Sequence, residues 1–139
     1  MPRQSIATDT APQPLGAYAL AMEGHGLIVV TGQVARNPAS MAPLAPGSTG
    51  AEEISGDIRE QTRRALLNIQ AILRAGGSDL GLVLKTTCFL AHSDDFSAFD
   101  EVYGQFFPGD PPARSTVAVG LLPPCLVMIE AVAARSTGG

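Results

Sequence analysis

The sequence predicts a single α+β domain, residues 1–139, in which two helices cover one face of a β-sheet. Three observations predict this class. Two stretches repeat apolar residues at helical spacing, five stretches are rich in residues typical of strands, and together they follow the order ββαβαββ. A length of 139 residues suits one domain with one core, and no internal repeat or linker divides the chain.

The first two strands are predicted to form a hairpin. Residues 17–22 and 27–33 are apolar, and a short connection with two glycines, Glu23-Gly24-His25-Gly26, joins them. We therefore expect His25 in a turn. Residues 37–50 contain three prolines and two glycines, which is typical of a loop without regular structure.

The next segment changes to helical periodicity. Acidic residues near its start and Arg74 near its end complement the helix dipole, and Gly76-Gly77 ends the pattern. Gly56 disfavours the first turn and so allows a later start. A helix is predicted over residues 51–75, with one apolar stripe formed by Ile54, Ile58, Ala65, Leu66, Ile69, Ile72 and Leu73.

The second half of the chain is predicted to add three strands and one helix. Residues 82–91 are an apolar run that contains threonine, which is typical of a strand. Residues 94–107 return to helical spacing, with Ser93 as the candidate N-cap and Pro108-Gly109 as terminator. Residues 113–120 and 125–134 are predicted strands, and residues 121–124 between them predict a second hairpin.

The last predicted strand is apolar on both faces. One face carries Cys125, Val127, Ile129, Ala131 and Ala133, and the other carries Leu126, Met128, Val132 and Ala134. An antiparallel sheet with helices on one side normally alternates apolar and polar residues. Charged residues make up 16% of the chain, below the roughly 25% of typical domains. We therefore expect the second face to pack against other copies of the chain.

Charge and composition exclude several classes of function. A net charge of -4 without a run of Lys or Arg disfavours nucleic acid as a partner. Residues 1–10 lack the apolar core of a signal peptide, and no segment has about 18 successive apolar residues, so we expect a cytoplasmic protein without a membrane partner. Cys88 and Cys125 lie in apolar runs and are expected as buried, reduced thiols. His25 and His92 lack ligand spacing, so no metal site is predicted.

Glu130 is the ionisable residue of the doubly apolar strand. A buried carboxylate costs several kcal/mol unless it has a partner or its pKa rises. Arg114, in the preceding strand, is the nearby cation. If the hairpin pairs Thr116 with Glu130, Arg114 lies on the same face as Glu130, whereas a slip of one residue would separate them. A structural ion pair and a functional pocket both remain open interpretations.

Short segments along nearly the whole chain resemble the YjgF/RidA family. Pro112-Ala113-Arg114-Ser115 and Ile129-Glu130-Ala131, with Glu130 sixteen residues after Arg114, are similar to the C-terminal signature of that family. The joint order and spacing of the segments carry the resemblance. The other matching segments are Ala11-Pro12, Gly16-Ala17-Tyr18, Thr31-Gly32-Gln33, Asn37-Pro38, Asn68 within residues 61–76, Lys85-Thr86-Thr87, Phe96 and Tyr103-Gly104-Gln105-Phe106-Phe107.

The resemblance implies a chorismate-mutase-like fold, a homotrimer, and active sites between neighbouring subunits. It implies hydrolysis of reactive 2-imino or 2-enamino acids, such as 2-iminopropanoate and 2-iminobutanoate, to 2-keto acids and ammonia, without a cofactor. Arg114 would bind the substrate carboxylate, and Glu130 would hold or activate the attacking water. The substrate-binding residues that the resemblance implies are Tyr18, Thr31, Gly32, Asp100 and Thr116.

Several positions differ from the common pattern of the family. Thr116 stands where many members have Cys, Asp100 where Asn is common and Ala17 where Pro is common, and the loop at residues 39–50 is longer. These differences affect the choice of substrate more than the fold. Alternative functions are a non-catalytic trimer that binds small carboxylates or acts as a chaperone, and a deaminase for an aminoacrylate or aminomuconate. A ribonuclease is disfavoured by the acidic net charge.

Overall fold

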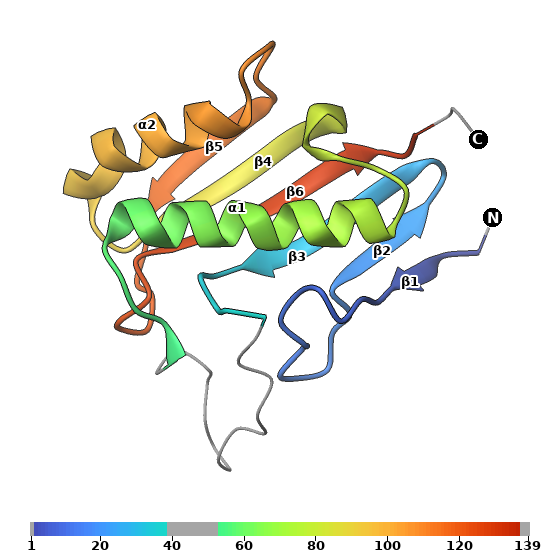
Figure 1. Ribbon diagram of the computed structural model, residues 1–139, viewed down its shortest axis with the longest axis horizontal. Helices are drawn as coiled ribbons and strands as arrows, with labels where there is room; N and C mark the ends of the chain where they lie inside the picture. Colours follow the sequence, from blue (N-terminus) through green and yellow to red (C-terminus); the bar gives the residue numbers. More distant parts are fainter. Residues whose placement is uncertain (1, 39–52, 137–139) are drawn as a thin grey trace.

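A computed structural model describes residues 2–38 and 53–136, and Figure 1 shows its architecture. One six-stranded sheet has the order β1-β2-β3-β6-β4-β5, and both long helices lie on the same face of it (Figure 1). The predicted α+β class is confirmed. The elements are β1 (Gln4–Ile6), β2 (Ala21–Gly24), β3 (Leu27–Gln33), α1 (Ile58–Ala75), β4 (Val83–Leu90), α2 (Phe96–Phe106), β5 (Ala113–Ala118) and β6 (Val127–Ala134), with short 3-10 turns η2 (Leu80–Leu82) and η3 (Ser93–Asp95).

The predicted N-terminal hairpin is confirmed, although β2 starts at Ala21 rather than at residue 17. Gly24 pairs with Leu27, so His25 and Gly26 form a two-residue turn. Both have positive φ angles, 53° and 77°, as in the turns that match the twist of a hairpin. Strand β1 was not predicted, because three residues with one buried side chain leave no periodic signal.

Helix α1 begins at Ile58 rather than at residue 51, because Asp57 caps its N-terminus. The Asp57 carboxylate accepts a hydrogen bond from the Glu60 N–H at 2.9 Å and so satisfies one free donor of the first turn. Gly76 ends the helix, as predicted, with its N–H directed at the carbonyls of the last turn. Most of the predicted loop over residues 37–50 lies outside the described residues.

Helix α2 begins at Phe96, after the 3-10 turn η3. The prediction that Ser93 caps this helix is wrong, because Ser93 is the first residue of η3. Asp95 occupies the cap position of α2 and makes no side-chain cap hydrogen bond. The helix ends at Phe106, just before the predicted terminator Pro108-Gly109.

The prediction that the last two strands form a hairpin is also wrong. Strand β4 lies between them, paired in parallel with β5 and antiparallel with β6. Helix α2 carries the chain from β4 back to the start of β5, and such a crossover makes two strands parallel. The segment after β5 then crosses β4, and β6 joins the sheet on the far side. Thr116 consequently pairs with Cys88, and Glu130 pairs with Thr87.

The core lies between the helices and one face of the sheet. Ile129 and Ala131 of β6 are buried there, whereas Met128 and Val132 lie on the opposite, open face. No helix among residues 2–38 and 53–136 covers that open face (Figure 1). Val29, which pairs with Val132, is 52% exposed. The predicted apolar character of both faces is confirmed, while the trimer that would cover the open face stays a prediction.

Buried polar side chains join α1 to the loops around it. The Gln61 side chain donates to the carbonyls of Gly56 and Pro124 at 3.0 Å each and accepts from the Leu126 N–H at 2.8 Å. The Asn68 amide donates to the Val34 and Arg36 carbonyls. No helix in the described part of the chain is long and apolar enough to cross a membrane.

Candidate functional site

Arg114 lies on edge strand β5 and points toward α2. It pairs with Thr86, which is buried beneath the helices, so its side chain is on the helix face of the sheet. Its Nη1 donates to Asp100 Oδ1 at 2.6 Å. The guanidinium lies over three rings of α2, with centroid distances of 4.7 Å to Tyr103 and 5.5 Å to both Phe96 and Phe99. These contacts hold the cation in place while 23% of the side chain stays exposed.

A cavity of about 440 Å³ opens beside Arg114. It is lined by Asp100, Tyr103, Gly104, Phe107, Gly109, Pro111, Pro112 and Arg114. The Tyr103 hydroxyl and the Thr86 hydroxyl are 2.7 Å apart, and burial raises the pKa of Tyr103. This hydrogen bond fixes the ring on which Arg114 rests. The guanidinium is therefore held on its buried side and open to the cavity on the other side.

Thr116 lies two residues after Arg114 on the same face of β5. Its partner in β4 is Cys88, a core residue whose pKa burial raises to about 11. The Thr116 hydroxyl is buried and has no hydrogen-bond partner in the described part of the chain. Three predicted site residues, Arg114, Asp100 and Thr116, therefore belong to the same side of the sheet.

Glu130 lies on the opposite side of the sheet from Arg114. It pairs with Thr87, the neighbour of Thr86, and successive residues of a strand point to opposite faces. The sequence left open whether Arg114 and Glu130 share a face, and the pairing of Thr116 with Glu130 that would place them together does not occur, because β5 and β6 do not pair directly. Arg114 is paired with Asp100 instead, and Glu130 is exposed on the open face.

A bulge in β3 lies directly opposite Glu130. Val30 pairs with Ala131 and Gln33 with Ile129, so Thr31 and Gly32 together face the single residue Glu130. Bulges of this kind redirect side chains and are frequent beside active sites. The structure therefore brings three predicted residues, Thr31, Gly32 and Glu130, to one place on β3 and β6.

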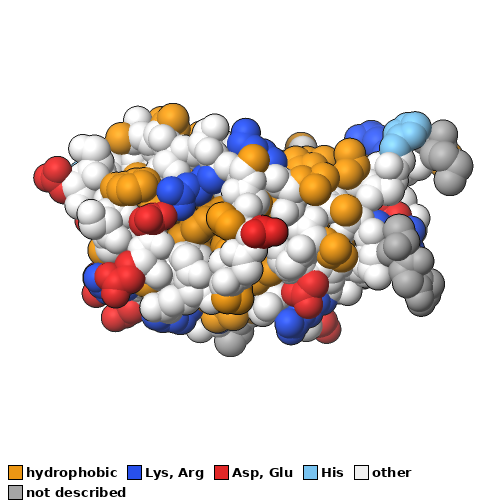
Figure 2. Space-filling model, turned by 90° about the horizontal axis from the view of Figure 1, so that it is seen from above, with side chains coloured by type: hydrophobic (Ala, Val, Ile, Leu, Met, Phe, Trp, Pro, Cys, Tyr) orange, Lys and Arg blue, Asp and Glu red, His pale blue; other side chains and the backbone are white. Residues whose placement is uncertain are grey.

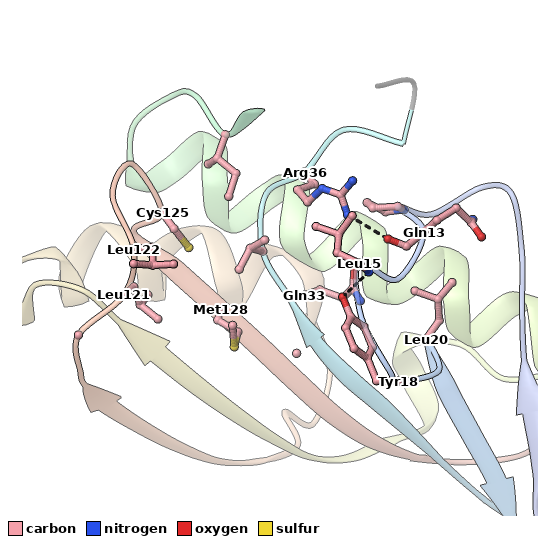
Figure 3. A pocket seen from close by; sticks show the side chains of 15 residues that line it. Gln13, Leu15, Tyr18, Leu20, Gln33, Arg36, Leu121, Leu122, Cys125 and Met128 are labelled. Carbon is pink, nitrogen blue, oxygen red and sulfur yellow. Dashed lines mark hydrogen bonds between the residues drawn. The ribbon is translucent and has the colours of Figure 1, made fainter. Parts of the chain in front are cut away.

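Tyr18 and Gly32 line a second cavity, of about 330 Å³ (Figure 3). Tyr18 and Leu15 line one side, whereas Leu121, Leu122 and Met128 lie across from them (Figure 3). The Tyr18 hydroxyl accepts from the Leu15 N–H at 3.1 Å, which fixes the loop before β2. A Cβ on Gly32 would lie 2.7 Å from Met128 Sδ, so the Met128 side chain packs directly against the Gly32 backbone.

Arg36, which was not among the predicted site residues, also lines this second cavity. It is buried, donates to the Gln13 carbonyl at 3.0 Å and forms an ion pair with Glu53 at 3.4 Å. These partners indicate a structural role in holding the loop before β2. The contact of Arg114 with three aromatic rings was also not predicted. The helical spacing of Phe96, Phe99 and Tyr103 indicated only that these rings lie on one side of a helix.

The edge of the molecule at α2 and β5 carries mixed charge. Figure 2 looks onto the edge at which α2 and β5 lie in Figure 1, and acidic and basic side chains stand next to each other there, among apolar ones. Within residues 2–38 and 53–136, no three His, Cys, Asp or Glu side chains come together in a way that could hold a metal ion. Cys88 and Cys125 are both buried free thiols, as predicted.

Comparisons with known proteins agree with the segments quoted above. The model of the Endoribonuclease L-PSP family matches residues 8–135. Rat 2-iminobutanoate/2-iminopropanoate deaminase is 37% identical, with 96% of this chain and 90% of the rat protein covered. AldR of Lactococcus lactis, which is named as a regulator, is 42% identical over 92% of this chain and 94% of its own. The crystal structure of Escherichia coli TdcF with bound serine superimposes with a TM-score of 0.82 at 32% identity, over 96% of this chain and 99% of TdcF. The chain therefore belongs to the Endoribonuclease L-PSP family, the YjgF/RidA family that its motifs resemble.

Proposed function

We propose that this protein is a deaminase that hydrolyses reactive 2-imino and 2-enamino acids to 2-keto acids and ammonia. The observation that carries the proposal is Arg114, a permanently charged donor held on three aromatic rings and still open to a cavity. A planar guanidinium in such a position suits a carboxylate ligand. The 37% identity to a relative named 2-iminobutanoate/2-iminopropanoate deaminase supports this choice of reaction.

We further infer that the protein works as a homotrimer with a reaction cleft between neighbouring chains. Arg114 and Glu130 lie on opposite faces of the same sheet, so a cleft that uses both must take them from two chains. The open face is apolar and lacks a cover among the described residues, as expected of a surface that associates. One chain would supply Arg114, Asp100 and Thr116, and its neighbour would supply Glu130 with Thr31, Gly32 and Tyr18.

The chemistry requires orientation and the movement of protons. Arg114 binds the carboxylate of the protonated imine and so presents C2 to the water held by Glu130. The water oxygen bonds to C2, and Glu130 accepts a water proton. Glu130 then returns that proton to the amino nitrogen, the C2–N bond breaks, and the departing ammonia takes up the proton that the C2 hydroxyl releases. The sum is one protonated imino acid and one water converted to one keto acid and one ammonium ion.

The test is to generate the imine with a threonine dehydratase and follow its decay and the appearance of 2-oxobutanoate. We expect the wild-type protein to accelerate hydrolysis, and both Arg114→Ala and Glu130→Gln to lose at least about a hundredfold of that acceleration. Arg59→Ala is the matched control, because this exposed cation pairs with Glu101 away from both groups. An unchanged decay rate with wild-type protein would reject the proposal.

A second candidate is a trimer that binds small carboxylates without turnover. A relative named as a regulator and a related structure with bound serine favour this candidate. It predicts that 2-oxobutanoate or serine binds with Arg114 dependence while the imine decays at its uncatalysed rate. Ribonuclease activity, which the family name suggests, is disfavoured by the net charge of -4.

A further inference from the structure

The carboxylate of Asp100 changes what the Arg114 anchor can bind. Asp100 Oδ1 lies 2.6 Å from Arg114 Nη1, and both residues line the cavity of about 440 Å³. The two partners differ in freedom. The Arg114 side chain rests on three rings and is 23% exposed, whereas the Asp100 side chain is 49% exposed and is held only by this ion pair within residues 2–38 and 53–136. The cation is therefore fixed, and the anion can turn toward a ligand.

A lone arginine would attract any small carboxylate, but this cavity presents one positive and one negative charge side by side. A ligand with only a carboxylate must share Arg114 with Asp100, and its charge is repelled by the Asp100 carboxylate. A ligand with a cation next to its carboxylate meets both charges favourably. On the face that Figure 2 shows, acidic and basic side chains are interspersed, without a large area of one sign.

The protonated imino acid is such a ligand, whereas its hydrolysis product is not. In the protonated form the C2 iminium nitrogen is positive and donates hydrogen bonds, and the carboxylate is on the adjacent carbon. In the 2-keto acid the C2 oxygen is neutral and only accepts hydrogen bonds, so it cannot donate a hydrogen bond to a carboxylate. The two molecules differ at the atom that Asp100 can reach when the substrate carboxylate is on Arg114.

We propose that Asp100 makes the Arg114 cavity selective for zwitterions, so that it holds a protonated 2-imino acid in preference to the 2-keto acid. The Arg114 guanidinium takes the carboxylate, and the Asp100 carboxylate accepts a hydrogen bond from the iminium nitrogen. This inference deepens the proposed function and rests on it for the identity of the natural ligand. Asp100 thus favours the electrophilic, protonated substrate and speeds release of the keto acid.

Two stable ligands with the same four-carbon skeleton test the inference without turnover. L-2-Aminobutanoate carries an ammonium group on C2 and stands for the iminium, and 2-oxobutanoate is the product. We would titrate each into the wild-type protein, Asp100→Asn and Arg114→Ala at pH 7 and follow backbone amide shifts by NMR. The wild type is expected to bind the amino acid more tightly. Asp100→Asn is expected to shift the ratio of the two affinities at least about tenfold toward the keto acid, and Arg114→Ala to weaken both.

Glu101→Gln is the matched control, because it removes one negative charge from the next residue of α2 and breaks only the exposed pair with Arg59. Its affinity ratio is expected to equal that of the wild type. The inference is overturned if the wild type prefers the keto acid, if neither ligand binds, or if Asp100→Asn leaves the ratio unchanged. Parallel measurement of imine hydrolysis separates the two proposals. Selective binding without hydrolysis rejects the deaminase alone, and hydrolysis without an effect of Asp100→Asn on the ratio rejects the zwitterion selectivity alone.

Discussion

Two inactive variants are expected to restore each other's activity when their chains assemble together. Arg114 and Glu130 are on opposite faces of the sheet, with β4 between their strands, so one chain cannot bring both to one ligand. An Arg114→Ala chain keeps the Glu130 half of a cleft, and a Glu130→Ala chain keeps the Arg114 half. Mixed oligomers should therefore contain some complete clefts.

The size of the effect follows from the geometry. A cleft is complete when the chain on its Arg114 side is a Glu130→Ala chain and the chain on its Glu130 side is an Arg114→Ala chain. With equal amounts and random assembly, each condition is met in half of the cases, so about a quarter of the clefts are complete. The whole randomly assembled population should show about a quarter of the wild-type rate, whereas each variant alone stays near the uncatalysed rate.

The assay would co-express the two variants with different affinity tags and isolate the oligomers that carry both tags. Isolation of both tags removes the oligomers that contain only one variant. The fraction of complete clefts then rises above a quarter, so the measured rate should exceed a quarter of the wild-type rate. Separately purified variants that are combined without chain exchange serve as the control and should show only the sum of their residual rates. Mixed oligomers that are isolated intact and remain no more active than this sum would refute the assignment of the two residues to different chains.

Other expected effects concern stability. Asp57→Ala should lower the free energy of unfolding by about 1 kcal/mol in urea denaturation, because the Glu60 N–H loses its hydrogen-bond acceptor. Asp57→Asn should retain most of the stabilisation by the cap. Asn68→Leu should cost about 3 kcal/mol in the same assay, since the partly buried Val34 carbonyl and the buried Arg36 carbonyl lose their donor; an effect below about 1 kcal/mol would contradict this. Gly32→Ala should cost about 1 to 3 kcal/mol by crowding Met128 Sδ, and the Met128→Ala background should reduce that cost. Burial raises the pKa of Cys88 from 9.0 to about 11, so the folded state retains a proton that the unfolded chain releases. This thiol alone should therefore lower stability by about 1 kcal/mol per pH unit between pH 9 and 11, and Cys88→Ala should reduce the slope, leaving the part that comes from buried Cys125 and Tyr103, whose pKa values burial also raises.

Local patterns were sufficient to predict most elements. Helix α1, the turn at His25 and Gly26 and the two faces of β6 all follow from periodicity or turn chemistry between neighbours in sequence. The start of α1 at Ile58 rather than residue 51 depends on which acidic residue caps the helix, and Asp57 differs little from its neighbours in type.

The order of the strands could not be predicted in the same way. Strands β5 and β6 are neighbours in sequence, and that proximity favoured a hairpin, but α2 makes β5 a parallel partner of β4 and leaves β6 on its other side. The faces of Arg114 and Glu130, which the sequence left open, are set by their separate pairing with Thr86 and Thr87 of β4. The pairing of Arg114 with Asp100 was likewise hidden, because it depends on how α2 lies across β4 and β5.

The position of β6 bears on how the chain acquires its structure. Strand β6 follows the other five strands in the sequence, yet it is an inner strand of the sheet, hydrogen-bonded to β3 on one side and β4 on the other. Until β6 is synthesised, no strand joins β1, β2 and β3 to the β4–β5 pair by hydrogen bonds. The sheet can therefore form only after residues 127–134 have been made, which is slow for such distant contacts and leaves strand edges unpaired in the meantime. A chain that stops before residue 127 should consequently aggregate during synthesis rather than accumulate as a smaller folded domain.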